Sequence, residues 1–440
     1  MMNYIKICIS AILTLLSIQV SAQDILTKKE ALQIALGNNY GVIIANNNVE
    51  IAKNNSSIYN SRYLPTLSTS AGANYNNSNQ EIESQGGEIT NINGAETKSY
   101  NASVNLNYTL FDGLGRKYNY KQLQETYNLS ELQARETIEN MYLQLFTVYF
   151  QIARLSENTK NLKSTLEISK QRLIRAQYQY DYGQSTKLEL LNAEVDVNND
   201  SINLLNSKQL YSNTKRDLNI VLGIQKDINY MVETDVNFIT LMSYDELLAK
   251  AKENNVLLQQ NEKNIAISEF NIKANKAGYL PTAGLSGSYG WNKSENPATS
   301  FFARSNSTGL NAGINLSWNL FDGGNTKTRV ANAKITLENQ EILKEQQLET
   351  IENTLKNTLE EYNNTLFILQ AQKQNVITNQ NNFDRTEEKY KLGQVTSIEF
   401  RQAQINLLNT RTALNNAKYD AKLIELELLQ LSGQLLNVAF

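Results

Sequence analysis

The chain has 440 residues, a formal charge of −3 at neutral pH, no His and a single Cys. Its Lys and Arg residues are scattered, so no basic patch indicates binding to nucleic acid. The one Cys, Cys8, lies in the leader described next, so the remainder excludes disulfides, Cys nucleophiles, His bases and His/Cys metal sites. The composition therefore argues against an enzyme and predicts no cofactor and no metal site.

Residues 1–22 are typical of a signal peptide. Lys6 supplies a short positive region, Ile7 to Val20 form an apolar run, and Val20-Ser21-Ala22 fit a cleavage site for small residues. The run is short for a bilayer span, although a membrane anchor is the alternative interpretation. No later segment reaches the length of a transmembrane helix, so a membrane role would have to use β-strands.

The first half of the mature chain alternates between helical and extended patterns. A short amphipathic segment around 28–36 predicts a first helix. The segment 42–64 predicts a second helix, which ends at Tyr63-Leu64-Pro65. The apolar period then changes from 3.6 to 2. In 67–75 and again in 104–110, apolar or small residues alternate with Ser, Asn, Gly and Thr. This pattern predicts strands with one apolar and one polar face. The same pattern, taken alone, also suits a sheet half-buried on a soluble core.

Long helices follow the strands. From Arg116 to Tyr182 and from Gln184 to Leu222 the sequence contains neither Gly nor Pro and is rich in good helix formers. The first segment alone would be a helix of about 100 Å. Gly183, the single break between them, predicts a tight reversal and hence a helical hairpin. Helices of this length demand a coiled-coil or helical-barrel arrangement.

The second half repeats this order. Tyr-Leu-Pro recurs 216 residues later, ending at Pro281, whereas Phe-Asp-Gly and Tyr-x-x-Gly recur 210 residues later, at Gly323 and Gly393. The six-residue difference falls between the paired strands, where polar linkers (76–98 and 292–307) are expected to form surface loops. The repeat predicts helices around 244–252 and 256–279, strands at 285–291 and 314–320, and helices at 325–392 and 394–432.

Four strands cannot close a barrel, and open sheet edges are not tolerated in lipid. The protomer must therefore associate, and three copies would supply twelve strands.

The combination of duplicated Tyr-Leu-Pro, duplicated Phe-Asp-Gly and Tyr-x-x-Gly resembles the TolC-type outer-membrane efflux family over essentially the whole mature chain. The resemblance implies a mainly α fold with a transmembrane β-barrel contribution: a duplicated unit whose long helical hairpins form an α-barrel, with four strands per protomer of a trimeric 12-stranded β-barrel. It also implies a homotrimer in outer-membrane lipid that extends into the periplasm and docks to a periplasmic adaptor and an inner-membrane transporter.

The resulting prediction for function is a channel, the exit duct of a tripartite efflux or type I secretion system. The alternative is a secreted coiled-coil structural or adhesin subunit. The predicted segments, in chain order, are a signal peptide (1–22), N-terminal helices (23–64), a strand pair (65–112), a periplasmic hairpin (113–223), a linker (224–242), the second copy's helices (243–280), strand pair (281–322) and hairpin (323–433), and a tail (434–440).

The resemblance also selects candidate residues. In the family the hairpin tips form the closed end of the channel and the landing site of the adaptor, which makes Tyr180, Gly183, Tyr390 and Gly393 the adaptor-contact candidates. Positions six and nine after the tip Gly carry acidic rings in family members with a known gate; here they are Glu399 and Gln402 in the second copy, and Glu189 and Asn192 in the first. Pro65, Gly113, Pro281 and Gly323 are the predicted structural turns. The alternatives are that the tip residues only shape the turn and that a lone Glu is a solvated surface residue.

Overall fold

A computed structural model describes residues 25–225, 230–240, 243–298 and 300–438. The predicted signal peptide (1–22) lies outside them. The chain forms two compact units, one from the described parts of Met1–Asn46, Gln133–Leu258 and Gln347–Phe440, the other from Asn47–Leu132 and Gln259–Gln346. Within the described ranges, no helix is both long enough and apolar enough to cross a membrane.

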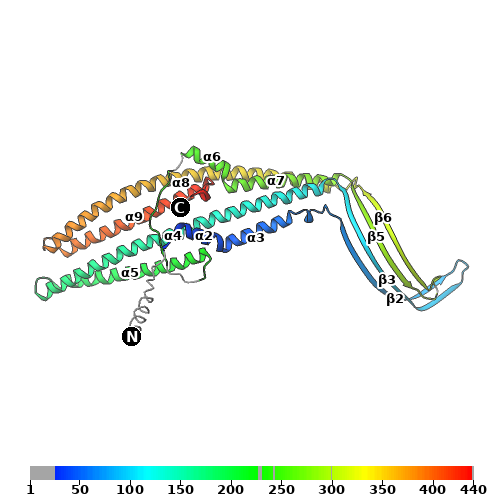
Figure 1. Cartoon of the computed structure of the whole chain (residues 1–440), viewed down its shortest axis with the longest axis horizontal. Helices are drawn as coiled ribbons and strands as arrows, with labels where there is room; N and C mark the ends of the chain where they lie inside the picture. The colour runs from blue at the N-terminus through cyan, green and yellow to red at the C-terminus, as the bar shows by residue number, and fades with distance from the viewer. Residues whose placement is uncertain (1–24, 226–229, 241–242, 299, 439–440) are drawn as a thin grey trace, which may run out of the picture. The chain divides into compact units, whose positions relative to one another are not determined.

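The helices confirm the predicted duplication (Figure 1). The first copy contains α2 (Lys28–Asn38), α3 (Tyr40–Asn55), α4 (Gly115–Asp181) and α5 (Lys187–Leu222); the second contains α6 (Tyr244–Asn254), α7 (Val256–Lys276), α8 (Asn325–Lys391) and α9 (Ser397–Leu431). The pairs α4–α5 and α8–α9 are the two long hairpins. Short 3₁₀ turns lie at Ile58–Asn60, Ala277–Tyr279 and Leu435–Asn437.

One predicted helix is shorter than expected. The helix placed at 42–64 ends at Asn55, and the chain continues through a 3₁₀ turn. Ser56 donates its hydroxyl to the carbonyl of Lys53, and Ser57 accepts from the amide of Tyr59. Such local side-chain bonds compete with the helical backbone, which explains why the Asn- and Ser-rich segment terminates the helix.

Four strands form one sheet in the order β2 (Thr66–Glu83), β3 (Ile89–Asp112), β5 (Thr282–Glu295) and β6 (Arg304–Ser317), with every neighbouring pair antiparallel (Figure 1). The two hairpins share one register under the repeat, since Thr66 faces Asn107 in the first and Thr282 faces Ser317 in the second. The outer edges of the sheet belong to β2 and β6.

Two expectations about the strands were wrong. The segments expected as surface loops, 76–98 and 292–307, are mostly paired strand, and only 84–88 and 296–303 connect the strands. Backbone pairing continues past the apolar stretch because polar cross-strand contacts support it, such as the Tyr75 hydroxyl donating to Glu96 Oε1 at 3.0 Å. In the opposite sense, the strand expected at 314–320 ends at Ser317.

The main core lies in the helical unit. Tyr142, Phe146, Tyr149, Phe150 and Tyr419 are all at most 3% exposed and pack on the leucines and isoleucines of α4, α5 and α9. Each such buried side chain contributes roughly 1.5–3 kcal/mol. The Tyr149 hydroxyl also bridges the small parallel ladder of β1 (Ile25–Leu26) and β4 (Met231–Val232). It donates to the Leu26 carbonyl at 2.6 Å and accepts from the Glu233 amide at 3.0 Å.

A duplicated Asn–Gly joint connects helix ends in this unit. Asn39 caps the start of α3 and donates to the carbonyl of Val221 at 2.8 Å; Asn255 caps α7 and donates to that of Leu431 at 2.9 Å. The glycine that follows each acceptor helix, Gly433 in the second copy, has φ near +70°. A Cβ on Gly433 would lie 2.3 Å from the carbonyl oxygen of Asn254, so only glycine fits there.

Candidate functional site

The two hairpin tips are built alike. Gly183 (φ 71°) and Gly393 (φ 75°) adopt the left-handed conformation that ends α4 and α8. The amides of Gly183 and Gln184 donate to carbonyls of the last helical turn, and the same two bonds recur at Gly393. This is the Schellman arrangement that favours glycine. Thr186 and Thr396 then cap the following helices, so the turn chemistry accounts for both glycines.

The tip tyrosines differ in exposure. Tyr390 is 8% exposed, stacks on Phe400 with ring centroids 4.7 Å apart, and has the Arg175 guanidinium 4.9 Å from its centroid. Tyr180 is 39% exposed. Tyr390 therefore packs the two helices of its own hairpin and the neighbouring α4 together, whereas Tyr180 offers part of its ring to solvent. The residues after them, Tyr182 and Leu392, are 78% and 71% exposed.

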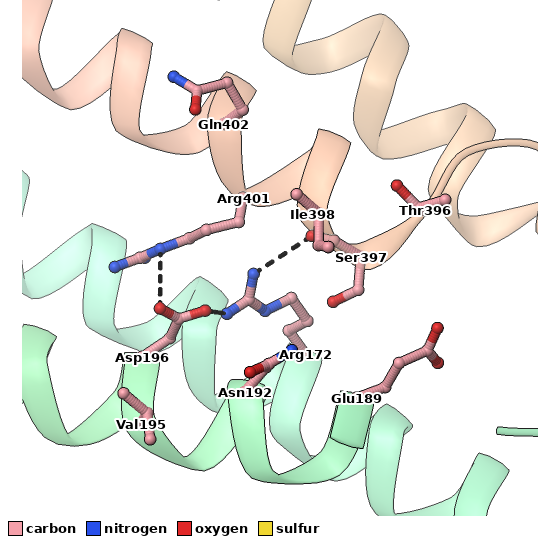
Figure 2. A pocket seen from close by; sticks show the side chains of 10 residues that line it. All are labelled: Arg172, Glu189, Asn192, Val195, Asp196, Thr396, Ser397, Ile398, Arg401 and Gln402. Carbon is pink, nitrogen blue, oxygen red and sulfur yellow. Dashed lines mark hydrogen bonds and ion pairs between the residues drawn. The ribbon is translucent and has the colours of Figure 1, made fainter. Parts of the chain in front are cut away.

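Three of the four gate candidates share one pocket. Glu189, Asn192 and Gln402 line a cavity of about 300 Å³ between the two hairpins, together with Arg172, Asp196 and Arg401 (Figure 2). The fourth candidate, Glu399, is not among the lining residues. Its carboxylate accepts from the Thr396 amide at 2.7 Å and from the Thr396 hydroxyl at 2.9 Å.

Both glutamates stand at the third position of a helix. Glu399 forms a complete capping box with Thr396, while the Glu189 amide donates to Thr186 and its carboxylate accepts from the Ser185 hydroxyl. The backbone and side-chain hydrogen bonds from Thr396 hold the pKa of Glu399 below its ordinary value. Glu399 is therefore an anionic cap at the tip of the second hairpin.

Charged side chains in the wall of this pocket and behind it, buried or half-buried, link the two hairpins. Arg172 on α4 is 3% exposed, pairs with Asp196 on α5, and donates to the Ser397 carbonyl of α9 at 3.4 Å (Figure 2). Arg401 extends from α9 toward α5, where its guanidinium donates to both carboxylate oxygens of Asp200 at 2.8 and 2.7 Å. Two arginines and two aspartates thus balance one another across the junction.

Neutral partners complete this charge network. Ser169 donates to Asp200 at 2.6 Å, and Gln404, 2% exposed, donates to Ser169 and to the Thr165 carbonyl. Burial alone would lower the pKa of Arg401, but its hydrogen bonds and charge attraction to Asp200 raise it, so the guanidinium stays charged. A bidentate, buried Arg–carboxylate pair is one of the stronger polar contacts that proteins form.

Sequence reasoning did not find this charge network. Arg172 and Arg401 are ordinary charges on amphipathic helices, and their aspartate partners lie one helical turn apart with nothing to mark them as buried. The only available signal was that Arg401 lies between the two gate candidates Glu399 and Gln402.

The predicted turn residues lie at the ends of the sheet. Pro65 and Pro281 immediately precede β2 and β5. Gly113 has φ 69°, and a Cβ there would lie 2.6 Å from the Ala277 carbonyl oxygen. Gly323 has φ 70° but open space around it, so its conformation alone favours glycine.

The aspartate of each Phe-Asp-Gly motif has its own role. Asp112 accepts from the Arg116 amide at 2.9 Å, and Asp322 accepts from the Thr326 amide at 2.8 Å. Each aspartate caps the first turn of the long helix that follows, so the motif has the same local role in both copies.

Known proteins share this architecture. Residues 31–223 and 247–434 match the family described as Outer membrane efflux protein. The chain is 21% identical over 381 residues to outer membrane protein TolC of Vibrio cholerae, covering 85% of this chain and 83% of that protein. Among solved structures, CusC has a TM-score of 0.76 at 18% identity, covering 92% of this chain and 91% of that one. The Campylobacter jejuni CmeC outer membrane channel gives 0.75 at 18%, covering 92% and 85%.

Proposed function

The chain belongs to the outer membrane efflux protein family, and from that premise we propose that it is the exit duct of a tripartite efflux or type I secretion system. Membership places it in the outer membrane with an extension into the periplasm, and its relatives are channel proteins rather than enzymes. In the proposal, substrate passes from an inner-membrane transporter and a periplasmic adaptor through this duct to the outside.

The sheet carries the proposal. Successive side chains along each strand point to opposite faces of the sheet, one apolar and one polar. Within the described residues, each of the two outer strands has one edge without a partner strand. The polar face holds a hollow of about 530 Å³ lined by Ser68, Asn105, Asn107, Ser286, Ser288 and Asn311, among others. In lipid, such a sheet must close on itself through further copies, with the polar face around water. Three copies give the twelve strands of a homotrimeric barrel.

The hairpin tips are the proposed closed end and adaptor site. Arg172 and Arg401 tie the two hairpins together close to both tips, so a channel closed there opens only when such contacts rearrange. An adaptor that binds the open arrangement more tightly than the closed one shifts the equilibrium by that difference in affinity. Tyr182 and Leu392 are the exposed tip residues best placed to meet it, beside Tyr180.

We also propose a ring of carboxylates where the hairpin tips narrow the channel. Glu399 of each copy, and Glu189 in the first hairpin, would place anions around the axis, favour cations and bind divalent ions. Calcium or magnesium should then lower single-channel conductance in the wild type and have a smaller effect in a Glu399→Gln variant. Conductance that ignores both ions in the wild type contradicts the ring.

Two experiments test the function. The processed protein should fractionate with the outer membrane, migrate on gels in a heat-modifiable way and conduct ions in planar bilayers. Recovery as a secreted filament or adhesin without conductance would favour the coiled-coil alternative. Photo-crosslinkers at Tyr182 and Leu392 should capture a periplasmic adaptor, while one at Ser84, in the β2–β3 turn, should not. Equal capture from Ser84 contradicts docking at the tips.

A further inference from the structure

The polar face of the sheet has a uniform composition. Its residues are the even-numbered ones on β2 and β5 and the odd-numbered ones on β3 and β6. One row of directly opposite residues crosses all four strands, at Ser68, Asn105, Ser288 and Asn311. Each polar-face position is Ser, Thr, Asn or Gly over 66–76, 97–109, 282–294 and 305–317. The polar face therefore presents hydroxyl, amide and backbone groups along most of the sheet.

Charged residues of these strands lie on the apolar face, at the end of the sheet away from the helices. Lys98, Lys293 and Arg304 all alternate with polar-face positions. Lys98 pairs with Glu96 at 3.5 Å. Lys293 and Arg304 pair with one carboxylate, that of Glu295, at 2.8 and 3.1 Å. These charges nearly balance one another, and the sheet itself separates them from the polar face.

Aromatic rings are on the same side as these charges. The rings that alternate with polar-face positions are those of Tyr75, Tyr100, Tyr108, Tyr289 and Trp291. Lys98 lies over the Tyr75 ring, 5.8 Å from its centroid, and Lys293 lies over the Tyr100 ring at 5.6 Å. The apolar face therefore holds both the cations and the rings that could attract a charged solute.

Toward the helices, charge returns to the polar face at Asp112. Past the irregularity at Leu110, Asp112 lies opposite Thr282, which is a polar-face position. Its carboxylate accepts from the Arg116 amide at 2.9 Å and from Arg116 Nε at 3.1 Å. This acidic side chain is paired with a guanidinium at the start of α4, so the uncharged region ends where the helices begin.

We propose that the section of the channel formed by this sheet does not select its cargo by charge and passes cations, anions and neutral polar solutes alike. This inference rests on the proposed channel and specifies where its selectivity lies. Pores that select by charge carry rings of charged side chains. The hydroxyl of Ser and the amide of Asn each donate and accept hydrogen bonds, so they can replace water around ions of either sign. Selection by charge then belongs to the helical section, where Glu189 and Glu399 lie.

A single fixed charge on the polar face would be enough to change this behaviour. In water, a unit charge about 10 Å away changes the local concentration of a monovalent ion about twofold, in opposite directions for cations and anions. One such charge in each of three copies would change the ratio of cations to anions by roughly tenfold at 10 mM salt, where the Debye length is about 30 Å. At 1 M salt the Debye length is about 3 Å and the effect disappears.

A cysteine on the polar face can report this ratio locally. Cys8, in the predicted leader, is the only Cys of the sequence, so Ser288→Cys introduces a single thiol into the processed protein. Positively and negatively charged methanethiosulfonate reagents of similar size are added to outer-membrane vesicles at 10 mM salt. The ratio of their two reaction rates is divided by the same ratio for a free small thiol. Ala312→Cys, on the apolar face, is the control for exposure to water.

Two variants of Asn107 calibrate the measurement. Asn107 is diagonal to Ser288 on the polar face, about 7 Å away. Asn107→Asp combined with Ser288→Cys should raise the ratio roughly tenfold in favour of the positive reagent, and Asn107→Lys should lower it as much. Both effects should vanish at 1 M salt. Unchanged ratios in both variants at 10 mM salt would contradict the claim that the composition of this face sets its selectivity.

The inference predicts that Ser288→Cys alone reacts with both reagents at a normalised ratio within threefold of one. A normalised ratio more than threefold from one, in either direction, overturns the inference and leaves the proposed channel standing. If Ser288→Cys reacts no faster than Ala312→Cys with either reagent, the polar face does not meet water, and the proposed channel fails as well.

Discussion

Replacing Arg401 by Met is the sharpest perturbation of the hairpin junction. Asp200 is 3% exposed, and in Arg401→Met it would keep the Ser169 hydroxyl but lose both guanidinium bonds. Removing one partner of a buried ion pair typically costs about 3–5 kcal/mol, because the remaining charge is left uncompensated. Each 1.4 kcal/mol is a factor of ten, so the equilibrium between packed and separated hairpins should shift by roughly 100- to 4,000-fold per copy.

The assay is the fraction of time that single channels spend open in planar bilayers without adaptor. Arg401→Met should open more often than the wild type. Asp200→Asn combined with Arg401→Met should recover much of the closed state, since the double variant buries no lone charge. Glu352→Gln is the control, because its bridge to Lys252 joins side chains that are 38% and 49% exposed and should be worth less than about 1 kcal/mol. An Arg401→Met channel that stays closed like the wild type refutes the idea that this charge network holds the tips.

Three further substitutions probe the helical unit. Gly433→Ala forces a Cβ against the Asn254 carbonyl at positive φ, so we expect at least about 1–2 kcal/mol of destabilisation. It is measured as a lower thermal midpoint in detergent, and an unchanged midpoint would show that the Asn–Gly joint does not require glycine there. Tyr149→Phe leaves the half-buried Leu26 carbonyl and Glu233 amide without the hydroxyl between them, which should cost about 1 kcal/mol in the same assay. A neutral result would show that the bridge between β1 and β4 is dispensable. Because the folded pKa of Glu399 is lowered, its stabilisation is present above the unfolded pKa and is lost as the pH falls through the folded one. Hydrogen exchange at the tip, corrected for intrinsic rates, should show that acid step in the wild type and not in Glu399→Gln; a step of equal size in both disproves the capping role.

Local sequence signals predicted those elements whose determinants lie within the element itself. Gly183 and Gly393 marked the hairpin turns, and the tracts without Gly or Pro gave α4, α5, α8 and α9 to within a few residues. The polar parts of the strands were missed because their pairing is a backbone property without apolar alternation. The end of β6 was missed for the opposite reason: the alternation continues through Leu320, but the strand lacks a neighbour within a single chain.

The candidate site was only partly predictable. Counting from the tip glycines selected Glu189, Asn192 and Gln402 as gate candidates, but that these three line one pocket is a finding of the structure that the sequence did not predict. It also selected Glu399, whose carboxylate is engaged by Thr396. The buried pairing of Arg401 with Asp200 joins residues about two hundred positions apart, and no local pattern encodes such a contact.

A channel built on this sheet requires that other copies of the chain close the open edges of β2 and β6. Native mass spectrometry of the processed protein, extracted from the outer membrane in detergent, tests this most directly. We predict the mass of three chains in one complex that dissociates on heating. A stable, water-soluble species with the mass of a single chain would contradict it.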